Sequence, residues 1–311
     1  MKRIKYCNFF VGVLVVLMLV ATVSTGAAII KPYPQVNAPA SSEQPVPPTA
    51  SSAQQPTASP TAQPTKALSP TQPQSEQPTM PTQPITAAIT QPPHDLPPQG
   101  KRAFLTFDDG PSNTTLRILD ILDQYNAKAT FFVIYHDEPD TVAIMQQIVQ
   151  RGHTIALHSY THNYSQIYSS VEAYFDDLTK IKDFVKQATG VDSDIIRFPG
   201  GSSNTVSRKY CSGIMSTLVN EVHNRGYEYF DWNCSNGDAS GNNISADRLY
   251  NELVNSANIN RDNLVILMHD TRAKSTTADS LPQILDYLRS NGYSFYGLTK
   301  GSPSAHHGVN N

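Results

Sequence analysis

Two histidines four residues apart, His158 and His162, have a spacing that suggests chemistry. Side chains four positions apart lie on one side of a helical turn, so both imidazoles can face one ligand. A pair of adjacent carboxylates, Asp108 and Asp109, occurs earlier in the chain in an Asp-Asp-Gly sequence that is typical of a turn. Two histidines and one carboxylate form a familiar hydrolytic zinc set that leaves positions open for water and substrate. The sequence therefore predicts a metal site made by the two histidines and Asp109.

Three further segments carry residues that can hold, protonate or contact a substrate. They are Arg197-Phe198-Pro199-Gly200-Gly201, Asp231-Trp232 and Leu267-Met268-His269-Asp270. Considered alone, Arg197 could be a surface cation, Trp232 a core residue and His269 a buried imidazole with a partner. Asp270 alone could be a cap. The functional interpretation therefore depends on where these segments fall among the predicted strands.

The predicted elements place these segments on one face. Short β-branched and aromatic runs alternate with longer amphipathic patterns, as in 171–185 and 281–288. This alternation implies parallel strands with helices outside them, either a doubly wound sheet or a closed barrel, and seven units favour the barrel. In both architectures the carboxyl ends of the strands meet on one face. Five of the seven predicted strands end in one of the motifs above. The predicted strands cover residues 103–107, 129–134, 153–157, 195–198, 227–231, 264–268 and 293–296.

The motifs, taken in order, resemble those of the polysaccharide deacetylases, which are carbohydrate esterase family 4 or the NodB-homology domain. They are Thr106-Phe107-Asp108-Asp109-Gly110, His158-Ser159-Tyr160-Thr161-His162, Arg197-Phe198-Pro199, Asp231-Trp232 and Leu267-Met268-His269. The resemblance covers about residues 101–299. It implies a distorted (β/α)7 barrel, a divalent metal that is usually zinc, and hydrolysis of N-acetyl groups from an N-acetylhexosamine polymer. Divalent ions other than zinc are also compatible with this resemblance.

The resemblance implies that Asp109, His158 and His162 bind the metal. It also implies that Asp108 is the general base and that Arg197 holds Asp108 in place. The chemistry of the reaction agrees with these roles. An amide carbonyl is a poor electrophile, so a metal is needed to polarise it and to supply an activated water.

The general acid implied by the resemblance is His269, and Asp231 would orient or tune it. An amine leaves only if it is protonated, so the reaction needs an acid as well as a base. Asp108, beside a cation and Arg197, should stay ionised at neutral pH, whereas a carboxylate beside His269 would favour its protonated form. Opposite protonation states suit these opposite roles.

The substrate-binding positions implied by the resemblance include one departure from the family pattern. Trp232 and Leu267 would form the pocket for the acetyl methyl group, next to Pro199. Many family members have an aromatic residue, commonly Tyr, after this proline, whereas this chain has Gly200. In the family the backbone N–H at that position helps to bind the oxyanion, and glycine keeps an N–H. We therefore expect the reaction to be retained and the groove wall to differ.

The chain divides by composition into four segments. Residues 1–30 begin with basic residues and continue with 25 uncharged ones, which indicates an export segment that is either a cleaved signal peptide or a retained membrane anchor. Residues 31–98 hold 18 of the 23 prolines and are predicted to be a disordered linker rich in Pro, Thr, Ser and Gln. The catalytic domain is predicted over 99–299 and a flexible tail over 300–311. We therefore expect extracytoplasmic localisation, either membrane-anchored with an external catalytic domain or secreted.

Charge and cysteine content restrict the partners. Residues 99–299 contain 17 Lys and Arg against 23 Asp and Glu, a formal charge of −6, so nothing indicates nucleic-acid binding. The expected partners are a glycan polymer and, if the export segment is retained, a bacterial membrane; a monomer is expected. Cys211 and Cys234 could form a disulfide in an oxidising compartment, but the sequence does not give their separation.

Three functional hypotheses follow. The leading one is N-deacetylation of peptidoglycan, because an export segment and linker would carry the domain into the cell wall. The second is an esterase that removes O-acetyl groups from xylan or a related polymer with the same residues. The third is a catalytically silent wall-binding module, which would be expected to lack the base, a metal ligand or the acid, and none of these is missing.

Overall fold

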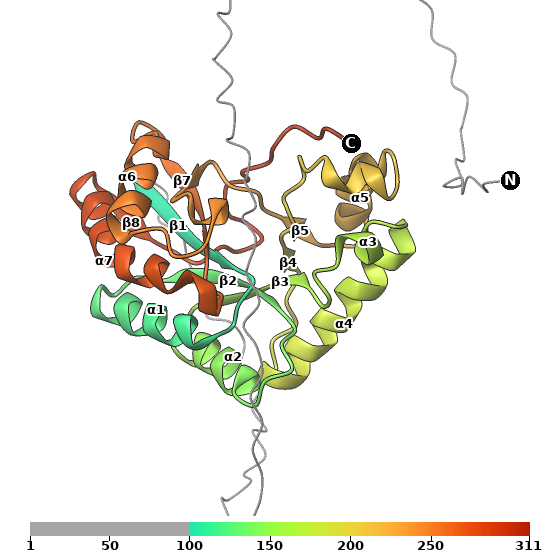
Figure 1. The fold of residues 1–311 in the computed structure, drawn as a ribbon, viewed down its shortest axis with the longest axis horizontal. Coiled ribbons are helices and arrows are strands. Elements are labelled where there is room, and N and C mark those ends of the chain that lie inside the picture. Colours follow the sequence, from blue (N-terminus) through green and yellow to red (C-terminus); the bar gives the residue numbers. More distant parts are fainter. Residues whose placement is uncertain (1–99) are drawn as a thin grey trace, which may run out of the picture. The chain divides into compact units, whose positions relative to one another are not determined.

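Parallel strands form the framework of residues 100–311, which are the residues that this computed structural model describes (Figure 1). Their order in the sheet is β5-β4-β3-β2-β1-β7-β6, and β8 also pairs with β1. Every pairing is parallel. The bounds are β1 Lys101–Asp108, β2 Ala129–Ile134, β3 Thr154–Ser159, β4 Ile195–Ile196, β5 Glu228–Tyr229, β6 Cys234–Ser235, β7 Asn263–His269 and β8 Tyr293–Phe295. Each of the seven predicted segments contains a strand, and β6 is additional.

The sheet curls into a half-barrel that stays open between β5 and β6. No ladder joins these two strands among the described residues. The α/β class and the parallel strands of the predicted distorted (β/α)7 barrel are therefore confirmed, but the sheet is a half-barrel and does not close into a ring. Two consecutive strands can pair in parallel only through a crossover of about a dozen or more residues. Residues 230–233 alone connect β5 to β6, without a helix between them, so these two edge strands do not pair.

The C-terminal residues occupy part of this gap. The Ala305 carbonyl accepts a hydrogen bond from the Asp231 amide at 2.9 Å, and the His307 amide donates to the Asp231 carboxylate at 2.8 Å. Further along, the Asn311 carbonyl accepts from the Ser216 amide at 2.7 Å. Segment 300–311, for which the sequence predicted a flexible tail, is thus bonded to the domain at the amide and carboxylate of Asp231, which follows β5, and at the Ser216 amide.

Helices cover one face of the sheet (Figure 1). Helix α4, Val171–Thr189, illustrates why they form. Its apolar residues recur on one side, the Ser170 hydroxyl caps its start by accepting from the Ala173 amide at 3.1 Å, and Gly190 ends it. The other α-helices are α1 Asn113–Gln124, α2 Thr141–Gln150, α3 Tyr164–Ile167, α5 Ile214–Asn224, α6 Ala246–Ser256 and α7 Ser275–Ser290, with α4 over Val171–Thr189. Short 3₁₀ helices are η1 Val206–Lys209, η2 Asp238–Ser240 and η3 Arg272–Lys274.

The two faces of the sheet have different contents because side chains alternate along each strand. On β1, Leu105 and Phe107 belong to the large core under the helices. Phe104 belongs to a second, smaller core made of strand and loop residues, and Thr106 and Asp108 share its face. The inner face therefore changes from apolar at the start of β1 to polar at its carboxyl end, where the site lies.

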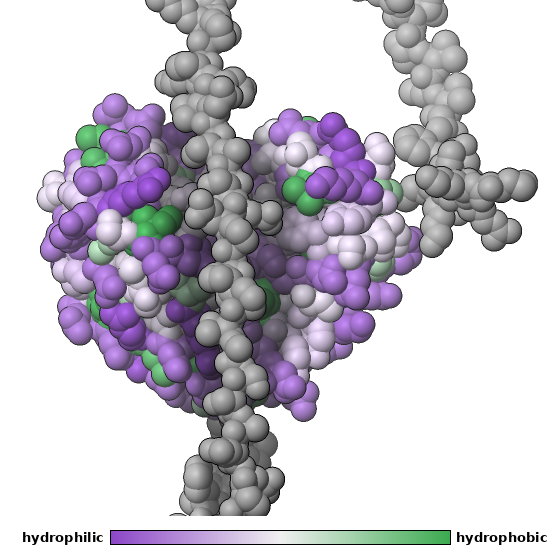
Figure 2. All heavy atoms as spheres, viewed as in Figure 1, coloured by the Kyte–Doolittle hydropathy of each residue, from purple (hydrophilic) through white to green (hydrophobic). Residues whose placement is uncertain are grey.

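Some expectations fall outside the described residues, namely the export segment 1–30 and the linker 31–98. Within residues 100–311, no helix is both long and apolar enough to cross a membrane. Figure 2 shows a mainly hydrophilic surface with isolated hydrophobic residues on the face in view. Cys211 and Cys234 are both buried and are not joined by a disulfide bond.

Candidate metal centre and active site

A sharp turn at the end of β1 carries the two adjacent carboxylates. Asp108 is the last residue of the strand, whereas Asp109 has a positive φ of 70°. The turn is held against β2, because the Asp109 amide donates to the Phe132 carbonyl at 3.2 Å and the Ile134 amide donates to the Gly110 carbonyl at 2.9 Å. The change in backbone direction gives the two carboxylates different partners.

Asp109 meets both predicted histidine ligands. Its Oδ1 atom lies 3.3 Å from His158 Nε2 and 3.3 Å from His162 Nε2, and the three ligand atoms lie within 4.8 Å of one another. His158 Nδ1 lies 2.7 Å from the Arg197 carbonyl. When Nδ1 donates that hydrogen bond, Nε2 presents its lone pair toward Asp109, as in metal-binding histidines. The structure therefore brings together the three predicted ligands.

A cation fits this group of donors. Asp109 Oδ1 is buried and has no hydrogen-bond partner among the described residues. A buried acceptor without a partner is costly, and here it faces two imidazole nitrogens that can also act as acceptors. A divalent metal would satisfy all three atoms at once, and the set of two imidazoles and a carboxylate suits zinc.

The ionisation of two of the three ligands, Asp109 and His162, is compatible with metal binding, whereas, against the effect of burial, the hydrogen bond with Asp109 and the charges of Asp108 and Asp109 raise the pKa of His158. Burial opposes ionisation of Asp109, but the interaction with His158 and the charges of His162 and His269 hold its pKa below the usual range. Burial and the charge of His158 lower the pKa of His162. At neutral pH Asp109 is thus a carboxylate and His162 a neutral imidazole, which are the forms that bind metals.

The loop between the histidines is not the helical turn that their spacing suggested. His158 lies in β3, and His162 has a positive φ of 50°. A buried carboxylate from α4, Asp177, folds this loop. Asp177 accepts hydrogen bonds from Ser159 Oγ at 2.6 Å, the Tyr160 amide at 2.7 Å, the Thr161 amide at 2.9 Å and Thr161 Oγ1 at 2.7 Å. The structure brings the two predicted histidines together, but the predicted helical turn between them is wrong, because hydrogen bonds to Asp177 on a distant helix replace the helical ones.

Asp108 is paired with a buried cation. Arg197 Nη1 lies 2.7 Å from Asp108 Oδ1, and the arginine side chain is 0% exposed. The guanidinium also donates to Thr106 Oγ1 at 2.7 Å, to the Phe230 carbonyl at 2.8 Å and to the Asp231 carbonyl at 3.0 Å. Since the arginine is fixed on several sides, it can hold the Asp108 carboxylate in one orientation. This pairing is the one that the sequence predicted.

His269, at the end of β7, is paired with a carboxylate that the sequence did not indicate. His269 Nδ1 lies 2.7 Å from Asp238 Oδ1, and the His269 amide donates to Asp238 Oδ2 at 2.8 Å. Thr277 Oγ1 also donates to Asp238 Oδ2, at 2.8 Å. Burial favours the neutral imidazole, but the hydrogen bond and charge of Asp238 outweigh it and raise the pKa of His269 to about 9. The imidazole is therefore protonated at neutral pH.

Asp231 has a different task from the predicted one. Its carboxylate accepts from the Ser202 amide at 2.8 Å, from Ser202 Oγ at 2.5 Å and from the His307 amide at 2.8 Å. It thus holds the loop that follows Pro199, whereas Asp238 orients His269. The prediction failed because Asp238 follows β6, a strand of two residues that leaves no periodic pattern. The available signal was a second carboxylate seven residues beyond Asp231 in an Asn-Gly-Asp turn sequence.

The predicted substrate-binding residues lie around this loop and on β7. The Pro199 carbonyl accepts from Tyr168 Oη at 2.8 Å, and Gly200 is exposed with a φ of 77°. The Trp232 ring lies against Gly201 and packs on the smaller core. Leu267 is buried on β7, opposite Thr106 in the register with β1. Pro199 and Gly200 thus lie on one loop, and Leu267 lies on the strand that ends in the predicted acid.

Asp270 is a further buried carboxylate beside the site. It contacts Gly110 in the β1 turn and accepts from Thr115 Oγ1 at 2.5 Å. Ser112 Oγ donates to the Asp270 carbonyl at 2.6 Å, and the Asp270 amide donates to the Asp108 carbonyl at 3.2 Å. Burial, reinforced by the charges of Asp109 and Asp108, raises the pKa of Asp270 to about 7. Asp270 therefore joins the ends of β1 and β7 and is more than the cap expected from sequence.

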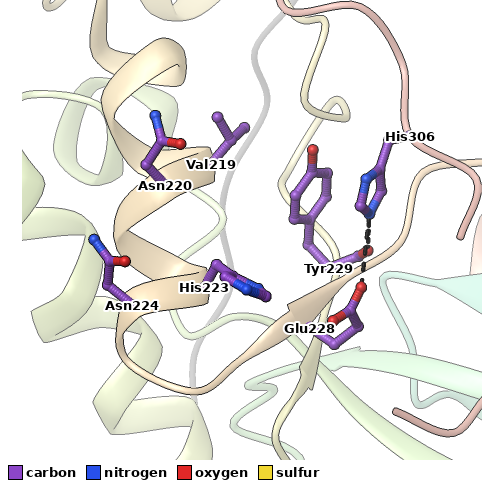
Figure 3. A pocket seen from close by; sticks show the side chains of 7 residues that line it. All are labelled: Val219, Asn220, His223, Asn224, Glu228, Tyr229 and His306. Atoms are coloured by element: carbon purple, nitrogen blue, oxygen red, sulfur yellow. Dashed lines mark hydrogen bonds and ion pairs between the residues drawn. The ribbon is translucent and has the colours of Figure 1, made fainter. Parts of the chain in front are cut away.

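Figure 3 shows a surface pocket at a different place, between α5 and β5. None of the predicted site residues lines it. His306 Nε2 lies 3.8 Å from Glu228 Oε1, and the His306 ring stacks on Tyr229 at 3.9 Å between ring centroids. Because this pocket holds none of the residues of the strand-end site, we assign the chemistry to that site. The lining residues are Val219, Asn220, His223, Asn224, Glu228, Tyr229 and His306.

Known proteins share both the sequence and the fold of this domain. The family model described as polysaccharide deacetylase matches residues 95–214. A bifunctional xylanase/deacetylase of Pseudobutyrivibrio xylanivorans is 36% identical over 207 residues, which are 64% of this chain and 30% of that protein. A peptidoglycan-N-acetylglucosamine deacetylase of Bacillus cereus is 31% identical over 197 residues, 63% of this chain and 68% of that protein.

Among solved structures, one similar fold is the catalytic domain of a peptidoglycan N-acetylglucosamine deacetylase from Eubacterium rectale. It is 46% identical with a TM-score of 0.65, and the match covers 70% of this chain and 96% of that one. The polysaccharide deacetylase Bc1974 from Bacillus cereus is 29% identical with a TM-score of 0.57, covering 68% and 96% of the two chains. The chain thus matches a catalytic domain nearly completely, but it spans less than a third of the xylanase/deacetylase.

Proposed function

Because the chain belongs to the polysaccharide deacetylase family, we propose that it removes N-acetyl groups from an N-acetylhexosamine polymer, with peptidoglycan as the substrate, by metal-dependent hydrolysis. The observation that carries this proposal is the arrangement at the carboxyl ends of β1, β3 and β7. There a carboxylate paired with Arg197, a group of three possible metal ligands and a protonated imidazole are brought together from separate strands.

Asp109, His158 and His162 would hold a divalent metal, for which zinc is our proposal. When bound, such an ion polarises a carbonyl and makes water a stronger nucleophile. The buried acceptor Asp109 Oδ1, which lacks a partner among the described residues, supports this assignment. These three residues would hold one carboxylate oxygen and two imidazole nitrogens at positions from which all three can bind one ion.

Asp108 is the proposed general base. It takes a proton from the water whose oxygen bonds to the acetyl carbon. The buried ion pair with Arg197 is 2.7 Å long. It fixes the orientation of the Asp108 carboxylate and compensates its negative charge. Arg197 thus acts through Asp108 as a positioning residue.

His269 is the proposed general acid. It donates its Nε2 proton to the sugar nitrogen as the carbon–nitrogen bond breaks, so acetate and a free amine are formed. Asp238 accepts from His269 Nδ1, which leaves Nε2 as the donor. The cycle closes when Asp108 loses its proton to solvent and His269 gains one.

The choice of polymer follows from the relatives and from the predicted export segment. Peptidoglycan-N-acetylglucosamine deacetylases are among the similar proteins. The match covers 96% of the solved catalytic domain of one of them. An exported domain on a linker would meet cell-wall glycan, so we propose extracytoplasmic action, either membrane-anchored or secreted. A second candidate is removal of O-acetyl groups from xylan, which the 36% identity to a xylanase/deacetylase favours.

Acetate release tests the proposal. The purified protein with added zinc should release acetate from peptidoglycan and from chitooligosaccharides faster than from acetylated xylan. Asp108→Asn is the matched control, because it keeps the shape of the base and removes its charge. Acetate from xylan alone would transfer the assignment to the esterase, and no acetate from any of the three polymers would refute deacetylation.

A further inference from the structure

Tyr164 is an active-site aromatic that no sequence motif indicated. It begins helix α3, two residues after His162, and its ring meets the His162 ring edge-on at 5.7 Å between centroids. The side chain is partly exposed, and its hydroxyl forms no hydrogen bond with another described residue. A phenol beside the metal ligands thus keeps its polar group available.

The Tyr164 hydroxyl lies above Gly200. A Cβ atom added to Gly200 would come 2.7 Å from Tyr164 Oη and 3.5 Å from a carbon of its ring. The phenol therefore occupies the space in which a side chain at position 200 would begin. Gly200 also has a φ of 77°, a conformation that L-residues with side chains rarely adopt. The aromatic side chain expected after Pro199 is absent, and another aromatic reaches the same place from α3.

The phenolic hydroxyl of tyrosine can donate one hydrogen bond and can accept another. The position of this hydroxyl over Gly200, on a ring that contacts His162, places that capacity on the wall of the catalytic site.

We propose that Tyr164 contacts the substrate, by lining the pocket over Gly200 and donating a hydrogen bond from its hydroxyl to the sugar that carries the acetyl group. The inference rests on the proposed function, since it names a contact of that site. Tyr164 and Gly200 act together: the missing side chain at 200 is what leaves room for the phenol.

The Tyr164 ring also has a structural contact, because it packs edge-on against Tyr168 at 5.5 Å. Removal of the whole ring could therefore disturb the loop. Tyr164→Phe avoids this problem, because it removes only the oxygen. Tyr250→Phe is the matched control, since Tyr250 packs on Tyr287 between α6 and α7, away from the site.

Steady-state kinetics of the full chain with zinc provide the first test. One neutral hydrogen bond should change KM for chitooligosaccharide by roughly 3- to 10-fold in Tyr164→Phe. Hydrolysis of 4-nitrophenyl acetate, which has no sugar, and the zinc dissociation constant should stay at their original values. An unchanged KM, or an equal loss on the sugar-free ester, would overturn the proposal.

A double-mutant cycle tests the pairing with Gly200. Gly200→Ala should raise KM in the original protein, because the new methyl group displaces the hydroxyl. In a Tyr164→Ala background the same change should have a smaller effect, since the backbone strain at 200 is common to both arms and cancels. Equal effects in both backgrounds would show that the phenol and residue 200 are not coupled.

The outcomes are separate from those of the proposed function. If the original protein releases no acetate from glycan, deacetylation fails. If it releases acetate and Tyr164→Phe has the same KM as the original, only the assignment of Tyr164 fails.

Discussion

The neighbouring carboxylates Asp108 and Asp109 define two halves of the site that differ in how completely their polar atoms are satisfied. Asp108 Oδ1 lies 2.7 Å from a fully buried Arg197 that has three further hydrogen-bond partners. Asp109 Oδ1 is also buried, but it has no hydrogen bond within the described residues. The protein thus supplies a counter-ion for the proposed base, whereas the proposed metal-binding half has a buried oxygen that a cation could satisfy.

The acid belongs with the completed half. Asp238 satisfies both the imidazole and the backbone amide of His269. The difference agrees with the proposed division of roles: the residues proposed to transfer protons have hydrogen-bonded partners within the protein, whereas the proposed metal ligands converge on a common point. Mutations in the two halves should therefore have different signatures.

The largest effect should come from the metal half. Removal of metal with a chelator, or Asp109→Asn, should lower turnover by roughly 1,000-fold or more, because polarisation of the carbonyl is worth several kcal/mol. Zinc should restore the chelated protein but not Asp109→Asn at the same concentration. Acetate release and zinc titration measure these quantities.

Asp108→Asn is the control for that comparison. It should lose turnover and retain zinc, because Asp108 pairs with Arg197 and not with the histidines. If Asp109→Asn bound zinc as tightly as the original protein, the assignment of the metal half would be wrong.

The second prediction concerns the completed half. Arg197→Met removes one partner of a buried ion pair, so the free energy of unfolding should fall by about 3–5 kcal/mol. Arg117→Met is the matched control, because Arg117 pairs with Asp279 at 2.6 Å but is 50% exposed. That change should cost at most about 1 kcal/mol. Urea unfolding distinguishes them, and equal losses would contradict the view that Arg197 is a structural counter-ion.

The third prediction uses pH. A general acid must be protonated, so the activity of the original protein should fall as pH rises through the pKa of His269, about 9. In Asp238→Asn the main partner that raises this pKa is lost, while burial still lowers it and the charges of Asp108 and Asp109 still raise it, so the alkaline limb should move to lower pH. Turnover at pH 8 should fall by roughly 10- to 100-fold and recover partly at lower pH. A pH profile of kcat/KM with an unmoved limb would remove Asp238 from this role.

The sequence was sufficient for the residues that end long strands. Asp108 and His269 follow well-formed apolar runs, and parallel topology brings such ends together whatever the details of the loops. The same reasoning predicted that Asp109 and His158, which follow predicted strands, would lie at this end of the sheet. The distorted (β/α)7 barrel was predicted correctly in its α/β class and its parallel strands but not in its open edge, where only residues 230–233 connect β5 to β6.

The partners of these residues could not be predicted in the same way. Asp177 folds the histidine loop from a helix, and Asp238 reaches His269 from 31 positions away. Neither contact has a periodic signal, since each depends on how loops pack after the strands have paired. Tyr164 was missed for a similar reason: only the structure shows that its hydroxyl lies over Gly200.

The smallest predicted effect separates Asp231 from both halves. Asp231→Asn should leave the alkaline limb of the pH profile unchanged, because the Asp231 carboxylate bonds to Ser202 and His307 and not to His269. An amide in its place turns one acceptor into a donor that faces other donors, so the free energy of unfolding should fall by about 1–2 kcal/mol. Turnover should fall only about 2- to 5-fold, through the loop that carries Gly200. Profiles of Asp231→Asn and Asp238→Asn recorded side by side check this directly. A shifted alkaline limb in Asp231→Asn would show that Asp231 tunes His269, as its sequence motif suggested. Asp231 would then belong to the half of the site that holds His269.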